Sequence, residues 1–344
     1  MQAVVKTQKG AGHVELMDMP EPRARAGEVV IEVEFCGICG TDIHILHDEF
    51  PYWPPVILGH EFSGRIVDAG AETGLFKTGQ RVVCEPHTES CGHCYLCRAG
   101  DIHLCPMKRA PGWGIHGAFA RYVRVPERLL HAIPDHMSFE QAAMVEPAAN
   151  AVHDVIERAR MKAGDFVVVL GPGPIGTLSA MAAKAGGART VVLAGTPGDA
   201  EVRLARGREL GFETVNVAET DLVQYVKDHT GGVGADMVVE ASGSPKAAAM
   251  APDLLKRKGK ICAIGMTGGN RTVEFPWDRA VFKACEILFC LSTHYSSWDR
   301  TIHLIASGIM PAEKSITHTM PIQEWRRAFD ECEAQRAIKV LLHP

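Results

Sequence analysis

The feature that most restricts the fold is a glycine-rich turn set between a buried strand and a helix. FVVVL at residues 166–170 is a continuous apolar run, and GPGPIG at residues 171–176 follows it and opens a helical stretch. A strand that is apolar on both faces belongs in a parallel sheet covered by helices. Glycines at these spacings let the backbone approach a pyrophosphate, which the helix N-terminus then stabilises, although an ordinary glycine-rich turn is the alternative. The predicted dinucleotide-binding residues are Gly171, Gly173, Pro174, Ile175 and Gly176.

Apolar runs alternate with helical patterns up to about residue 292. The strands expected in this region are 166–170, 190–194, 214–217, 237–240, 260–264 and 287–291. Such alternation predicts an α/β fold with a doubly wound parallel sheet. The first 150 residues have β character instead, because Glu28–Phe35 alternates apolar with mostly acidic residues and Gly and Pro divide the rest into short segments. In the tail we expect helices near 301–307 and 325–333 and a last strand at 339–342.

The end of the second strand of this sheet leaves the choice between NAD and NADP open. An acidic residue there would bind the ribose 2′-hydroxyl of NAD, but the position holds Gly195, followed by Thr196. Asp199 comes later, on a lengthened turn. Arg203 is placed either to meet the 2′-phosphate of NADP or to be a solvated charge on a helix.

Four of the eleven cysteines fall within fifteen residues, as Cys91-x2-Cys94-x2-Cys97-x7-Cys105. Four thiolates at these spacings close a tetrahedral zinc site with no open position, which is a structural site. Free thiols or a redox pair are the alternatives, but four neighbouring thiols without a metal would be reactive. Two histidines of this segment, His93 and His103, are surplus to the four sulfurs, and we expect both at the surface.

A second group of metal-binding residue types lies upstream, in CGICGTDIH at 36–44 and GHE at 59–61. One thiolate, one imidazole and a carboxylate or water would make an open zinc site suited to catalysis. Spacing alone also permits a redox pair of Cys36 with Cys39 and a buried polar pair of His60 with Glu61.

Composition excludes several classes of function. Lys and Arg number 36 against 41 Asp and Glu, which gives a net charge of −5 and no basic footprint for nucleic acid or an anionic membrane. The apolar runs are far shorter than the roughly 20 residues of a membrane helix. The N-terminal MQAVVKTQKG has no apolar core of a secretory signal. We therefore expect a soluble, cytoplasmic protein without nucleic-acid or membrane partners.

The motif set resembles the zinc-containing medium-chain dehydrogenases. CGICGTDIH, GHEFSG, the four-cysteine segment, GPGPIG and VVEASG occur in the order typical of that family, and the resemblance runs nearly end to end. It is strongest to the sorbitol, threonine and polyol dehydrogenase branch. The resemblance implies two zinc ions per chain, one catalytic and one structural, with NAD or NADP. It implies hydride transfer between this cofactor and a small-molecule substrate, a secondary alcohol, polyol or sugar-derived alcohol.

The same resemblance assigns the catalytic zinc to Cys39, His60 and Glu146 and leaves Cys36 with a structural role. Glu61, beside His60, would approach the metal during turnover, so either glutamate is a possible direct ligand. From its position alone, Glu146 is equally a carboxylate favoured at the start of a helix.

Three residues of the first motif have implied roles around the zinc. Asp42 would hold the zinc-bound histidine in its correct tautomer. Thr41 and His44 would carry the substrate proton outward. Taken alone, Thr41 is also compatible with a turn hydroxyl, and His44 with a surface histidine.

The implied architecture is a Rossmann domain inserted into a GroES-like, β-rich catalytic domain. The boundaries expected are 1–149 with 293–344 for the catalytic domain, including the structural zinc lobe at about 85–108, and 150–292 for the NAD(P)-binding domain. Members of this family are commonly homodimers or homotetramers built through the nucleotide-binding domain.

The substrate itself is not determined by the sequence. Sorbitol-type members carry an Arg-Tyr pair after the last strand of the nucleotide-binding domain, whereas the nearest equivalents here are Thr293 and His294. An L-threonine 3-dehydrogenase-like or simple alcohol dehydrogenase activity is the alternative on the same scaffold. From other classes, a zinc-ribbon nucleic-acid binder is disfavoured by the acidic chain. A catalytically inactive binding protein would have had no need to keep Cys39, His60 and Glu146 together.

Overall fold

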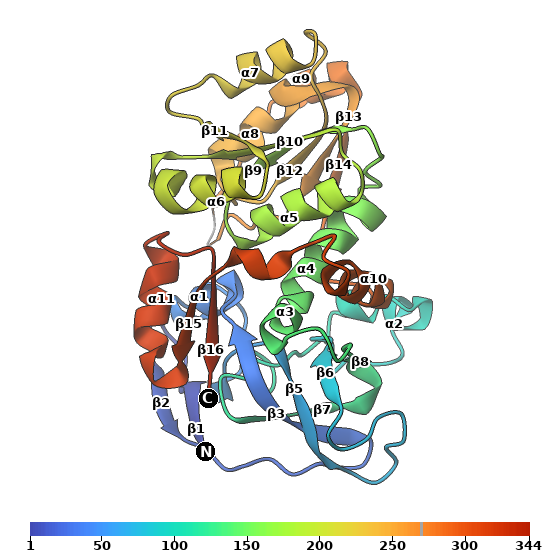
Figure 1. Ribbon diagram of the computed structural model, residues 1–344, viewed down its shortest axis with the longest axis vertical. Coiled ribbons are helices and arrows are strands. Elements are labelled where there is room, and N and C mark those ends of the chain that lie inside the picture. The colour runs from blue at the N-terminus through green and yellow to red at the C-terminus, as the bar shows by residue number, and fades with distance from the viewer. Residues whose placement is uncertain (269–270) are drawn as a thin grey trace.

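The computed structural model describes residues 1–268 and 271–344, and it arranges them as an α/β part above a β-rich part (Figure 1). A parallel sheet flanked by helices fills the upper part of the view, and both chain termini lie in the lower part. Helices α3 (Phe139–Ala143), α4 (Val145–Val152) and α10 (Tyr295–Ala306) lie where the two parts meet.

The α/β part contains a six-stranded sheet in the order β11-β10-β9-β12-β13-β14, and every neighbouring pair is parallel. Its strands are β9 (Phe166–Leu170), β10 (Thr190–Gly195), β11 (Glu213–Asn216), β12 (Ala235–Glu240), β13 (Leu255–Ala263) and β14 (Glu286–Phe289). Its helices are α5 (Pro174–Ala185), α6 (Ala205–Glu209), α7 (Leu222–His229), α8 (Pro245–Leu254) and α9 (Trp277–Lys283). All five residues of β9 are buried because neighbouring strands and covering helices enclose it. The predicted doubly wound parallel sheet is confirmed.

The β-rich part contains a seven-stranded sheet and a three-stranded sheet. The larger one holds β3 (Glu28–Gly37), β5 (Glu61–Ala69), β6 (Arg81–Cys84), β7 (Tyr122–Pro126), β8 (Leu130–Ala132), β15 (Ile316–Pro321) and β16 (Lys339–His343). The smaller one holds β1 (Gln2–Lys6), β2 (Val14–Asp18) and β4 (Val56–Ile57). Three helices complete this part: α1 (Gly40–Leu46), α2 (Tyr95–Ala99) and α11 (Trp325–Glu333). The last strand, β16, pairs antiparallel with β3, so the end of the chain joins the larger sheet of the β-rich part.

A buried histidine of the β-rich part binds a carboxylate of α10. His131, on β8, lies between two carboxylates, with Glu85 Oε1 3.0 Å from its Nε2 and Asp299 Oδ1 2.8 Å from its Nδ1. Its ring stacks on Trp298 at 5.4 Å. Burial alone would lower the pKa of His131, but the two carboxylates outweigh this and raise it. The charged form of His131 therefore stabilises the packing of α10.

Element boundaries differ from the sequence expectation mainly in α10, which begins at Tyr295 instead of near residue 301. The side chain of His294 caps the helix by accepting a hydrogen bond from the backbone N–H of Ser296. Histidine is not one of the preferred N-cap residues, so the sequence carried no start signal there.

Candidate active site and zinc centres

The four cysteines of the predicted lobe come together as one cluster. Their sulfur atoms lie within 4.8 Å of one another, with Cys91 and Cys105 3.7 Å apart and Cys91 and Cys97 3.9 Å apart. Tetrahedral zinc–thiolate bonds of about 2.3 Å require sulfur atoms about 3.8 Å apart. The backbone N–H groups of Cys94 and Cys97 donate to neighbouring sulfurs, at 3.3 and 3.4 Å. These hydrogen bonds stabilise thiolates, so the cluster fits a structural zinc ion.

The expectation that both histidines of the lobe are surface residues is wrong for one of them. His93 is exposed, but His103 is buried and its Nδ1 has no hydrogen-bond partner among the described residues. Its ring lies 5.7 Å from those of both His153 and His294. Burial, with help from His153, lowers the pKa of His103 to about 4, so the lobe packs a neutral imidazole against α4 and α10. No local pattern predicts this packing, because the partners of His103 lie about 50 and 190 residues away along the chain.

The second cluster joins two segments that are about 20 residues apart in the sequence. Donor atoms of Cys39, His60 and Glu61 lie within 4.8 Å of one another. Cys39 occupies the N-cap position of α1, whereas His60 and Glu61 lie at the start of β5. Gly59 turns the chain before them with a φ of +88°, and a Cβ atom there would come within 2.5 Å of the Phe119 ring. Only glycine suits this close approach.

Asp42 fixes the two segments relative to each other. The side chain is fully buried, and its two carboxylate oxygens accept hydrogen bonds from the backbone N–H of Cys39 at 2.9 Å and of Gly59 at 3.2 Å. Its interaction with His60 is Coulombic, and the Nδ1 of His60 has no hydrogen-bond partner among the described residues. Asp42 therefore positions the backbone on both sides of the cluster, a role that sequence reasoning did not anticipate.

Negative charge dominates this second cluster. Burial alone would lower the pKa of His60, but the Cys39 thiolate, Asp42 and Glu146 outweigh it and raise that pKa to about 10. Burial raises the pKa of Glu146 to about 7, and nearby Glu61 adds to this effect. A divalent cation would neutralise this concentration of charge, and thiolate, imidazole and carboxylate are all zinc ligands. The donor set fits zinc.

The two glutamates of the site are held differently. Glu61 belongs to the donor cluster with Cys39 and His60, and one of its two carboxylate oxygens, Oε2, pairs with buried Lys339 at 2.6 Å. Glu146, near the start of α4, is buried and receives only the amide of Asn150, 3.1 Å from its Oε1. Lys339 comes from β16, at the far end of the chain, and no local sequence signal linked it to Glu61.

The two residues predicted to move the proton lie on α1. The Oγ1 of Thr41 is 3.6 Å from the sulfur of Cys39, so this hydroxyl lies beside the donor cluster. One turn further on, His44 is about a quarter exposed, and its Nδ1 lies 3.0 Å from Glu49 Oε2. Gly268, in the loop after β13, lies next to the His44 ring, since a Cβ built on Gly268 would come within 3.3 Å of His44 Cε1. A loop that follows the carboxyl end of β13 thus contacts α1, on the side of the parallel sheet where such sheets bind ligands.

The glycine-rich turn has the geometry that the sequence predicts. Gly171 has a φ of +97°, Gly173 is the N-cap of α5, and Pro174 is its first residue. Gly176 packs so closely on the turn that a Cβ atom would lie 1.8 Å from the carbonyl oxygen of Gly171. Ile175 is partly buried against the core. The backbone is therefore open to a pyrophosphate in front of the α5 N-terminus.

At the end of β10 the possible ribose-binding residues contact one another. Asp199 is buried and accepts hydrogen bonds from Thr196 N, Thr196 Oγ1 and Arg203 Nη1, at 2.9, 2.8 and 3.1 Å. The Nε of Arg203 also donates to the carbonyl oxygen of Ala337. Gly195 has no room for a side chain, because a Cβ would lie 2.8 Å from Pro172. The Asp199 carboxylate is thus already used within the protein, and Arg203 is not a solvated charge.

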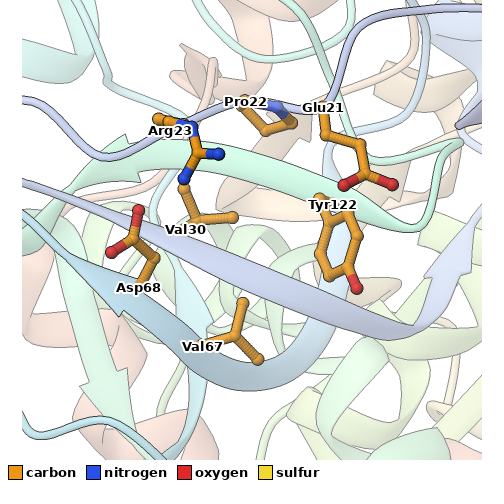
Figure 2. Close-up of a pocket in the computed structure, with 7 residues that line it drawn as sticks. All are labelled: Glu21, Pro22, Arg23, Val30, Val67, Asp68 and Tyr122. Atoms are coloured by element: carbon orange, nitrogen blue, oxygen red, sulfur yellow. The ribbon is translucent and has the colours of Figure 1, made fainter.

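A surface hollow of about 360 Å³ lies elsewhere, on the β-rich part (Figure 2). Figure 2 shows it lined by Glu21, Pro22, Arg23, Val30, Val67, Asp68 and Tyr122. It includes none of the predicted site residues, and its lining holds no cluster of metal ligands. We assign no chemistry to it.

These features define a class of protein, a dinucleotide-dependent dehydrogenase with zinc centres. Comparison with known proteins identifies the family to which the chain belongs. Residues 25–135 match the alcohol dehydrogenase GroES-like domain and residues 174–307 match the zinc-binding dehydrogenase domain. The chain belongs to this zinc-containing medium-chain dehydrogenase family, in its polyol and threonine dehydrogenase branch.

Individual relatives cover the whole chain. A sorbitol dehydrogenase of Halalkalibacterium halodurans is 37% identical over 100% of this chain and 99% of its own length. A D-arabitol-phosphate dehydrogenase of Enterococcus avium is 35% identical over 99% and 97%. A crystal structure described as a zinc-binding dehydrogenase of Sinorhizobium meliloti 1021, bound to NADP, superposes with a TM-score of 0.90 at 31% identity, covering 100% and 99%. The protein is a zinc-type alcohol or polyol dehydrogenase that uses NAD or NADP and acts on a small-molecule alcohol.

No helix of the described residues combines the length and the apolar character needed to cross a lipid bilayer.

The two clusters should lose zinc independently. We expect about two zinc ions per chain in the purified protein and about one in each of the variants Cys97→Ser and His60→Ala, because each removes one ligand from a different site. Metal content by inductively coupled plasma mass spectrometry measures this. Cys285→Ser and His136→Ala, which change the same residue types away from both clusters, should keep both ions. Two ions retained in folded His60→Ala would contradict the assignment of the second cluster.

Proposed function

We propose that this dehydrogenase oxidises a secondary carbinol within a polyol or sugar-derived alcohol, at the centre formed by Cys39, His60 and Glu146. The observation that supports this most is the gathering of the Cys39, His60 and Glu61 donor atoms next to a loop at the carboxyl edge of the parallel sheet, with buried Glu146 close enough for its charge to act on the pKa of His60. When bound, zinc supplies a Lewis acid that polarises the carbinol oxygen, and the nicotinamide accepts hydride.

The residues of the chain divide the remaining work. Cys39, His60 and Glu146 would hold the ion, and Asp42 keeps the segments of the first two in register through its backbone hydrogen bonds. Glu61 already lies in the donor cluster, and the oxygen that is not paired with Lys339 could bind the ion. We place Glu146 as the resting ligand because, among the described residues, its carboxylate has an amide partner, Asn150, but no cationic side chain within 4 Å.

The proton of the carbinol needs a route to solvent. Thr41 Oγ1, beside the Cys39 sulfur, is the hydroxyl placed to take part in its removal. His44, partly exposed one helical turn later, would pass the proton outward, with Glu49 stabilising the protonated imidazole. The Asp199–Thr196–Arg203 group would line the adenosine ribose of either cofactor.

The domain division that we propose is 1–149 with 293–344 for the catalytic domain and 150–292 for the nucleotide-binding domain. All six strands of the parallel sheet lie between residues 166 and 289, whereas β15 and β16 join β3. We also place the protein in the cytoplasm, because eleven free thiols, four of them in one metal-ready cluster, suit a reducing compartment.

The activity can be tested with a panel of alcohols. Zinc-loaded enzyme is assayed for reduction of NAD⁺ and NADP⁺ with sorbitol, D-arabitol, 2,3-butanediol, L-threonine and ethanol. We expect kcat/KM for at least one polyol to exceed that for ethanol and L-threonine by roughly ten-fold or more, since each matched hydroxyl contact contributes about 1 kcal/mol. His60→Ala should lose this turnover. Preference for L-threonine would favour the alternative activity, and no reduction of either cofactor would contradict a dehydrogenase role.

We further propose that two copies of the chain associate through β14. This strand is one of the two edge strands of the parallel sheet, and residues on and near it expose large apolar side chains. They are Trp277, Val281, Phe282, Phe289, Leu291 and Tyr295, each more than half exposed. An apolar edge strand of this kind is a template for pairing with a second chain.

Phe289→Asp should turn the dimer into a monomer, because a carboxylate would be buried without a partner in the interface. Sedimentation velocity measures the mass in solution. Leu75→Asp, at an equally exposed apolar residue of the β-rich part, is the matched control and should leave the dimer intact. A wild-type monomer, or a Phe289→Asp variant that remains a dimer, would contradict this interface.

A further inference from the structure

A lysine without an ionic partner lies between the zinc lobe and the candidate catalytic centre. Lys108 follows the last cysteine of the lobe by three residues, and its ammonium is largely buried. Its one hydrogen-bond partner among the described residues is the hydroxyl of Ser292, 3.1 Å away. Among the residues that the structure describes, no carboxylate oxygen lies within 4 Å of the Lys108 ammonium. An ammonium has three N–H donors, so two are left for another acceptor.

The position of Ser292 connects this lysine with the reaction site. Ser292 follows the carboxyl end of β14, at the edge of the parallel sheet where ligands of such folds bind. On the other side, Glu146 is close enough to Lys108 for its charge to act on the pKa of the ammonium. The lysine therefore lies between a residue that follows the sheet edge, Ser292, and the proposed zinc ligand Glu146.

The backbone at Ser292 is strained, and contacts of the next residue hold it in that conformation. Its φ is +65°, a left-handed conformation that costs a non-glycine residue of order 1 kcal/mol or more. The next residue, Thr293, is fully buried and holds the segment, because its carbonyl oxygen lies 3.1 Å from His87 Nε2 and its Oγ1 accepts from the Trp298 indole at 2.9 Å. Such strain persists where surrounding contacts fix it, and it is frequent at ligand sites.

Charge balance indicates what this pair would bind. Zinc at the catalytic centre would be neutralised by the Cys39 thiolate and Glu146, while Glu61 is already paired with Lys339. Lys108 would then carry a positive charge that no side chain of that centre offsets, while the Cys105 thiolate, whose charge also acts on this ammonium, would be shared with the lobe zinc. A buried, unpaired ammonium is costly, and an incoming anionic oxygen recovers that cost, whereas a neutral hydroxyl recovers little of it.

We propose that Lys108 and Ser292 form an anion-binding subsite of the substrate pocket, which selects polyols that carry a terminal phosphate or carboxylate over neutral polyols. The pair would bind the anionic end of the substrate while the carbinol lies at the proposed zinc centre. This inference rests on the dehydrogenase function proposed above and names the substrate class of that same site.

The test compares three compounds of one carbon skeleton, namely sorbitol, sorbitol 6-phosphate and gluconate. Isothermal titration of the zinc-loaded enzyme with NADP⁺ or NAD⁺ present gives binding without any need for turnover. We expect at least one anionic compound to bind roughly ten- to hundred-fold more tightly than sorbitol, as a charged hydrogen bond permits. The two anions distinguish a phosphate subsite from a carboxylate subsite.

Substitutions test whether Lys108 and Ser292 cause the preference for anionic over neutral polyols. Lys108→Met should abolish most of it while zinc content stays at two, and Lys108→Arg should keep part of it. Ser292→Gly, which suits the left-handed backbone, should fold well and weaken anion binding several-fold. Lys314→Met removes an exposed lysine elsewhere and should change nothing.

The outcomes separate the two proposals. Equal binding of all three compounds, or a preference that survives in Lys108→Met, would overturn the anion subsite, whatever the activity. Anion preference that depends on Lys108, in an enzyme that reduces neither cofactor with sorbitol 6-phosphate, gluconate or any alcohol of the panel, would support the subsite and overturn the proposed reaction. Loss of the lobe zinc in Lys108→Met with unchanged preference in Ser292→Gly would instead make Lys108 a counter-ion of the lobe and overturn the subsite.

Discussion

Concentrated negative charge, buried around Cys39, is the constraint on which the rest of this structure depends. A thiol, the carboxylates of Asp42, Glu61 and Glu146, and the imidazole of His60 share a space from which water is largely excluded. The protein offsets this charge in two visible ways. Backbone N–H groups satisfy Asp42, and Lys339 from the last strand pairs with Glu61. What remains, at Cys39 and Glu146, is the charge that a divalent zinc ion would neutralise.

Distant parts of the chain meet around this charged cluster. The C-terminal strand β16 brings Lys339 to the start of β5, and the loop after β13 brings Gly268 to His44. The segment after β14 brings Ser292 to Lys108. Each contact joins a residue of the β-rich part to one that arrives from much later in the sequence. The site is therefore a product of the whole fold, and a nucleotide bound at the sheet edge would lie directly against it.

Local pattern was enough to predict the features that depend on local geometry. The turn at Gly171–Gly176, the buried strand before it and the four-cysteine lobe are each contained in a short stretch of sequence with fixed spacing. The resemblance to a known family then brought Cys39, His60 and Glu146 together. Sequence reasoning could not find Lys339 as the partner of Glu61, the burial of His103 or the hydrogen bonds that occupy Asp199, because these depend on tertiary contacts. Asp42 was singled out, but its backbone hydrogen bonds were not foreseen.

The central claim is that the cluster at Cys39 is a zinc centre, distinct from the zinc lobe. Diffraction data collected at the zinc absorption edge from crystals of the purified protein test it most directly. The account predicts two anomalous peaks, one among the four lobe cysteines and one about 2.0–2.3 Å from the sulfur of Cys39 and a ring nitrogen of His60. A single peak confined to the lobe, with Cys39 and His60 in direct contact, would contradict it.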